Sequence, residues 1–88
     1  MNRKSGTHAK YPSEDDFRWD YLRQGAEVPQ LQSGQVVLVR YFMRPRLARV
    51  SSRVPGGVYW ARLMTPVGGS TRVLVTKNSL IAVARDEK

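Results

Sequence analysis

The 88-residue sequence contains no cysteine. Disulfides, thiolate zinc sites and a cysteine nucleophile are therefore excluded, and a reducing compartment, the cytoplasm, is the expected location. No apolar run approaches the roughly 20 residues that a membrane-spanning helix needs. The first ten residues, "MNRKSGTHAK", lack the apolar stretch of a secretory signal. We expect a soluble protein that has no membrane partner.

Acidic residues are also missing from most of the chain, since none lies between Val28 and Arg85. A pair of carboxylates for acid–base catalysis cannot form there, and neither can a carboxylate metal site. The one histidine, His8, lies in the polar N-terminal stretch, where a solvated side chain is expected. We therefore expect no enzyme, no metal site and no cofactor.

The positive charge is concentrated in the second part of the chain. Residues 1–30 hold five basic and five acidic residues and sum to zero, whereas residues 31–85 hold nine basic residues and no acid. A segment of one sign attracts polyanions, and eight of these nine residues are arginines, whose planar forks suit phosphate. Nucleic acid is the expected partner; the alternative is a soluble basic protein without one.

The N-terminal third shows signals for one short helix. Ser13 is a good N-cap, the acidic residues 14–16 suit the positive end of a helix dipole, and Gly25 suits the position after a helix. The expected organisation is a flexible tail over 1–12, an acidic amphipathic helix over 13–25, a linker over 26–33 and a β-domain over 34–85.

From residue 34 on, the apolar pattern has a period of two. Short runs rich in β-branched and aromatic residues alternate with turn signals such as "PGG" at 55–57 and "TPVGGS" at 65–70. Strands are predicted over 35–41, 46–54, 58–64, 71–76 and 80–84. Five short strands in about fifty positions predict an all-β fold, a small five-stranded antiparallel barrel.

The layout resembles SH3-like barrels of the Tudor and PWWP kind. Their opening G-D-x-V-x-A-K/R corresponds to residues 34–40, "GQVVLVR", and their W-P-A-x-V to 45–50, "PRLARV". The ending "VLVTKNSL" resembles their fourth strand, single 3₁₀ turn and fifth strand. An aromatic cage for methylated lysine would have to use Tyr41, Phe42 and Tyr59. No acid is available beside it, so recognition of a cationic peptide is not expected.

The chain also resembles type II dihydrofolate reductases, short chains in which four barrels share one pore. Their V-Q-I-Y strand would correspond to residues 73–76, "VLVT", which lack the glutamine and the tyrosine. This resemblance implies the same kind of barrel and carries over no active-site residue.

Strand alternation assigns the two faces, because an arginine without a partner charge does not enter a core. The side chains that point to the other face of each strand than the arginines form the predicted core: Val37, Val39, Ala48, Val50, Tyr59, Ala61, Leu63, Val73, Val75 and Leu80. Leu38, Trp60 and Leu74 are left on the outer face with the arginines. Either the helix or a second copy covers them, or Trp60 stacks on a base or a guanidinium.

We therefore expect a small basic binding module that contacts nucleic acid, DNA or RNA, mainly through phosphates and with low sequence specificity. The alternative is a protein–protein adaptor or self-associating barrel that uses Trp60, Leu38, Leu74 and the helix. The third hypothesis is an oligomeric pore enzyme. The predicted phosphate contacts are Arg40, Arg44, Arg46, Arg49, Arg53, Arg62 and Lys77. The predicted aromatic contacts are Tyr41, Phe42 and Trp60.

Overall fold

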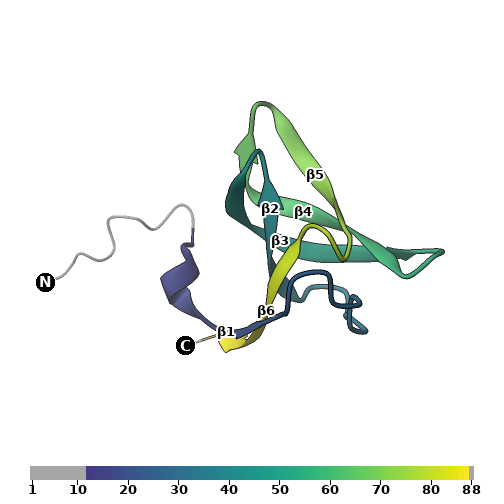
Figure 1. Ribbon diagram of the computed structural model, residues 1–88. Helices are drawn as coiled ribbons and strands as arrows, with labels where there is room; N and C mark the ends of the chain where they lie inside the picture. Colours follow the sequence, from purple (N-terminus) through teal and green to yellow (C-terminus); the bar gives the residue numbers. More distant parts are fainter. Residues whose placement is uncertain (1–11, 88) are drawn as a thin grey trace, which may run out of the picture.

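The computed structural model describes residues 12–87 and forms one antiparallel sheet (Figure 1). A 3₁₀ turn, η2 (Glu14–Asp16), precedes the first strand. The strands are β1 (Phe17–Tyr21), β2 (Val36–Tyr41), β3 (Arg44–Val54), β4 (Val58–Val67), β5 (Ser70–Val75) and β6 (Leu80–Glu87). The predicted all-β class is confirmed. The expected tail overlaps this part of the chain only at Pro12, so the prediction for the tail, including His8, lies outside the described residues.

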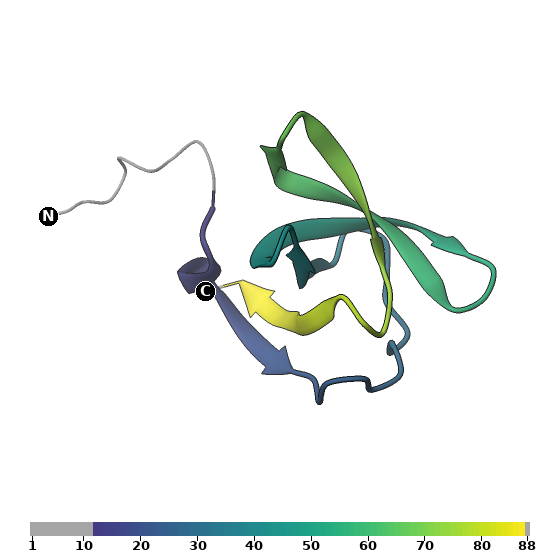
Figure 2. The same cartoon turned by 45° about the horizontal axis from the view of Figure 1, so that its top comes forward.

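The strand order across the sheet is β1-β6-β2-β3-β4-β5. The five predicted strands correspond to β2–β6, and β6 returns after a turn at 76–79 to pair with β2. The sheet is strongly twisted, and β1 lies alongside β6 at one end of it (Figure 2). Within residues 12–87 the sheet has six strands instead of the predicted five, because the N-terminal segment adds one to this edge.

One core fills the concave side of the sheet. All ten predicted core residues are buried there in a single cluster, which confirms the face assignment along β2, β4 and β5. Leu31, from the predicted linker, completes the cluster, and its backbone N–H donates to the hydroxyl of Tyr59 at 3.0 Å. Because strands β2 to β6 all contribute to one cluster, the sheet must curl around it, so the fold is barrel-like.

The predicted helix over 13–25 is wrong. Ser13 and Asp16 do form a cap, with the Ser13 N–H donating to the Asp16 carboxylate at 2.9 Å, but the helical turn ends at Asp16. The segment "FRWDY" that follows alternates aromatic and charged residues, so as a strand it places Phe17 and Trp19 on one face. Their rings lie 5.6 Å apart. A helix would have pointed these two rings in widely different directions, so the strand buries more apolar surface.

No helix within residues 12–87 is long and apolar enough to cross a membrane.

Candidate nucleic-acid interface

Two of the predicted phosphate contacts and a third arginine lie side by side across the convex face of the sheet. Arg49 on β3 is directly opposite Arg62 on β4, and Arg62 is directly opposite Arg72 on β5. Directly opposed residues point to the same side of a sheet, with their Cβ atoms about 4.5–5.5 Å apart. All three side chains are exposed. We call Arg49, Arg62 and Arg72 the arginine row.

Like charges in directly opposed positions destabilise a sheet. The row contains two such pairs, and the sequence supplies no carboxylate between Val28 and Arg85 to neutralise them. Sequence alternation predicted that Arg49 and Arg62 point outward, but the pairing register was needed to place them directly opposite each other. Arg72 was not among the predicted site residues, although it was predicted to face outward.

Trp60 lies beside the row on the same face. The guanidinium of Arg72 is 4.2 Å from the centroid of the Trp60 ring, which is a cation–π contact. A base or a guanidinium was expected to stack on Trp60, and in the structure the guanidinium of Arg72 does so. At the other end of the row, Arg49 donates from Nη1 to the backbone carbonyl of Gly34 at 2.9 Å. The side chain of Arg62 makes no hydrogen bond or ion pair with other described residues.

A second apolar cluster borders the row. Phe17, Val36 and Ala84 are buried in it, and three half-buried side chains pack against them: Trp19, Leu47 and Met64. Leu38, which was expected on the outer face, is only 2% exposed. It shares its face with Leu47, opposite it on β3, and Leu47 packs on this cluster. One interpretation was that the N-terminal segment covers part of the convex face as a helix. The segment does contribute to this face, but as a strand.

Arg53 does not join the arginine row, contrary to its predicted position on the same face as Arg49. A β-bulge at Ser51 shifts the register of β3 against β4 between Val50 and Ser52. The bulge reverses the alternation, so Arg53 is opposite Tyr59, whose side chain belongs to the core side. Arg53 is nevertheless exposed.

A second group of predicted contacts lies at the β2–β3 hairpin, where a longer loop was expected. The turn is made by Phe42 and Met43 alone, and Arg44 begins β3. The ring of Tyr41 stacks on that of Phe42, with centroids 4.6 Å apart and planes at 20°. Arg44 is exposed, whereas Arg46 is half-buried and donates from Nε to the backbone carbonyl of Tyr41 at 3.1 Å.

Arg40 and Lys77 form the third group. The backbone N–H of Arg40 donates to the carbonyl of Ser79 at 2.7 Å, which brings the end of β2 to the 76–79 turn. Both side chains line one small hollow of about 100 Å³. The structure therefore divides the predicted contacts into the row, the hairpin tip and this turn, with Arg53 separate.

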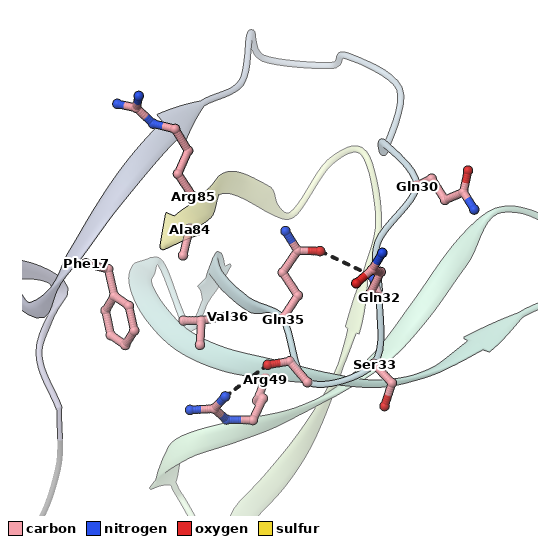
Figure 3. Close-up of a pocket in the computed structure, with 10 residues that line it drawn as sticks. Phe17, Gln30, Gln32, Ser33, Gln35, Val36, Arg49, Ala84 and Arg85 are labelled. Atoms are coloured by element: carbon pink, nitrogen blue, oxygen red, sulfur yellow. Dashed lines mark hydrogen bonds between the residues drawn. The ribbon is translucent and has the colours of Figure 1, made fainter. Parts of the chain in front are cut away.

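A groove of about 560 Å³ begins at the Arg49 end of the row (Figure 3). Arg49 and Arg85 project at its sides, and Gln35 accepts a hydrogen bond from the backbone N–H of Gln32 at 3.2 Å. Arg85 also forms an exposed ion pair with Asp20, Nε to Oδ1, at 3.0 Å. This groove was not predicted from the sequence, in which the amide-rich stretch "PQLQSGQ" at 29–35 is its only signal. The remaining lining residues are Phe17, Gln30, Ser33, Gly34, Val36 and Ala84.

Among residues 12–87, no group of three His, Cys, Asp or Glu side chains is placed to hold a metal ion. Comparison of the chain with protein-family models, with curated proteins and with solved structures gave no match.

Proposed function

We propose that this protein is a small nucleic-acid-binding module that contacts phosphates with low sequence specificity. The observation that carries the proposal is the arginine row, three directly opposed exposed arginines in a segment without a carboxylate. Bound phosphates would remove the repulsion within the row, and the planar guanidinium suits their oxygens. We propose that the protein acts as a binding module, not as an enzyme, and that it acts in the cytoplasm.

The dimensions of the row suit a phosphate backbone. Three neighbouring strands span roughly 10 Å, a length over which duplex DNA presents about six phosphates from its two strands. Two or three of these phosphates are within the reach of three arginines. Phosphate contacts fix position without reading bases, and low specificity follows from that.

We also propose that the barrel-like sheet is an SH3-like barrel of the Tudor and PWWP kind. The return of β6 to pair with β2, after a single turn, supports this assignment. Of the rings that would have to form a methyl-lysine cage, Tyr41 and Phe42 stack on each other, whereas Tyr59 is buried toward the other end of β3. Tyr41 is opposite Arg44 and Tyr59 is opposite Arg53, nine residues further along β3, or roughly 30 Å of strand. This separation favours a phosphate ligand over a methylated lysine.

A salt titration with matched variants tests the nucleic-acid proposal. The row variant carries Arg49→Gln, Arg62→Gln and Arg72→Gln. The control variant carries Arg18→Gln, Arg23→Gln and Arg53→Gln, three exposed arginines outside the row. Both variants have a net charge of +5 instead of +8, since each loses three arginines.

Binding of DNA and RNA oligonucleotides would be measured by fluorescence anisotropy at several salt concentrations. The row variant should lower the slope of log K against log salt by about 1.4–2.7, because each of the two or three lost phosphate contacts removes about 0.7–0.9. The control variant should leave the slope close to that of the wild type. Equal losses in both variants would mean that net charge alone drives binding. Absence of binding by the wild type at low salt would refute the proposal.

A protein partner, or a second copy of the chain, is a second candidate. Leu74 is 39% exposed on β5, which forms one edge of the sheet, and an edge strand can pair with another chain. Leu74→Lys should then lower the mass measured by light scattering. A monomeric wild type would exclude self-association.

A further inference from the structure

The β2–β3 turn carries bulky side chains in a backbone conformation that favours glycine and asparagine. Phe42 has φ of 53° and Met43 has φ of 63°. A two-residue hairpin turn of type I′ needs positive φ at both central residues, and Asn-Gly is its preferred sequence. A Cβ is disfavoured in this region, so Phe-Met at this turn is a local conflict between sequence and structure. Conflicts of this kind concentrate at functional positions.

Both side chains project from the molecule. Phe42 is 62% exposed and Met43 is 92% exposed. The Phe42 ring is nevertheless held from two sides. Tyr41 stacks on its face, and a Cβ on Gly68 would lie 3.6 Å from its Cε2, so the ring also lies against the main chain of the β4–β5 turn. The two hairpin ends lie at the same end of the sheet (Figure 1).

Cations surround this apolar tip. Arg40 and Arg44 lie on the two strands just before and after it, and both are exposed. The hydrogen bond from Arg46 to the carbonyl of Tyr41 ties the two strands together below the turn. The tip is therefore a braced apolar point between two exposed arginines, with no carboxylate in the surrounding sequence.

We propose that the tip, Phe42 and Met43, is a wedge that enters a base step of duplex DNA, while Arg40 and Arg44 contact the phosphates on either side. This inference rests on the proposed nucleic-acid binding and names the form of its ligand. Apolar side chains that enter a base step unstack it partly and bend the duplex, which then contacts more of the protein. The bend brings the flanking duplex toward the arginine row.

The side chains favour a duplex over a single strand. Proteins that bind single strands offer open aromatic faces on which bases stack. Here Tyr41 stacks on one face of Phe42, and Arg72 covers a face of Trp60. Met43, the outermost side chain of the turn, has no ring and can supply apolar volume alone.

The position of the row argues against a lipid surface as the ligand. Arg49 lies five residues from Arg44 along β3, or roughly 16 Å. A flat membrane that took up the tip end-on would leave the row beyond the Debye length of about 8–10 Å. A duplex bent at the tip can contact both.

The test replaces the tip by the sequence that its backbone prefers. The double variant Phe42→Asn, Met43→Gly removes the wedge, keeps every charge and relieves the turn. Wild type and variant would be compared on a duplex of 25–30 base pairs, about three turns, labelled at both ends for energy transfer and carrying 2-aminopurine. Anisotropy would give affinity and salt slope in parallel.

The wild type should increase both energy transfer and 2-aminopurine fluorescence. The variant keeps every arginine, so it should still bind DNA in a salt-dependent manner, but it should lose both signals. A higher melting temperature of the variant shows that the loss does not come from unfolding.

Three results would overturn the wedge. Bending by the variant equal to that of the wild type would do so, and so would binding by the wild type without either signal. The third is a variant that bends DNA as the wild type does but no longer co-sediments with phosphatidylserine-containing vesicles. The second result leaves the proposed phosphate binding intact, whereas absence of any DNA binding by the wild type would refute both proposals.

Discussion

Arg62 occupies the middle of the arginine row, so its replacement by glutamate changes both cross-strand pairs of the row at once. In the wild type it faces Arg49 on one side and Arg72 on the other. Arg62→Glu converts two like-charge pairs into two opposite-charge pairs. We expect the variant to be more stable than the wild type and to bind nucleic acid more weakly.

The size of the gain follows from the number of pairs. An opposite-charge pair directly across two strands contributes about 0.2–1 kcal/mol, and exposed ion pairs fall in the same range. Two pairs therefore stabilise the sheet by about 0.5–2 kcal/mol at low salt. For a domain of this size, each kcal/mol raises Tm by about 4–8 °C. Glutamate is a weak strand former, so Arg62→Gln is the reference that separates charge from strand propensity.

Urea and thermal denaturation at low salt and at 1 M salt would measure the effect. The gain of Arg62→Glu over Arg62→Gln should be largest at low salt and should nearly vanish at 1 M, where the Debye length is about 3 Å. Arg53→Glu compared with Arg53→Gln is the matched control. Arg53 is opposite Tyr59 and not opposite another arginine, so no comparable gain is expected. A destabilised Arg62→Glu at low salt, or an equal gain at both salt concentrations, would refute the electrostatic account of the row.

Three further predictions concern the apolar clusters, and urea denaturation checks each of them. Leu38→Ala should lower the free energy of unfolding by about 2–5 kcal/mol, because Leu38 is buried on the outer face of the sheet. Tyr59→Phe should cost about 1–3 kcal/mol and speed hydrogen exchange at the Leu31 amide, which loses its buried acceptor. Phe17→Ala should cost about 3–5 kcal/mol, whereas Tyr21→Ala on the same strand should stay within about 0.5 kcal/mol, since Tyr21 is 66% exposed. A Phe17→Ala variant as stable as Tyr21→Ala would contradict the covering role of β1.

The main core could be predicted from the sequence because its signal is local. Arginine marks the outward positions of a strand, and strict alternation then assigns the inward ones. The "PGG" turn was equally readable, since Gly56 and Gly57 both adopt positive φ where other residues are disfavoured. Each of these inferences needs only the residues within one strand or one turn.

The N-terminal strand could not be predicted in this way. Ser13 and the acidic residues after it are true helix-start signals, and they do produce one 3₁₀ turn. Whether "FRWDY" continues as a helix or a strand depends on the free edge of β6, more than sixty residues away, where Trp19 pairs with Ala84. The four consecutive buried residues of β2, 36–39, were the available signal, because a strand covered on both faces reads as a continuous apolar run.

The composition of the arginine row depends on pairing register rather than on residue type. Alternation alone places Arg49 and Arg53 on one face, four residues apart. The bulge at Ser51 turns Arg53 away, while the unshifted pairing on the other side of the bulge aligns Arg49 with Arg62 and Arg72. "VSSRV" carries no glycine or proline that would mark a bulge. Because register decides which like charges face each other, the one inserted residue moves Arg53 to the other face of the sheet and leaves a row of three arginines.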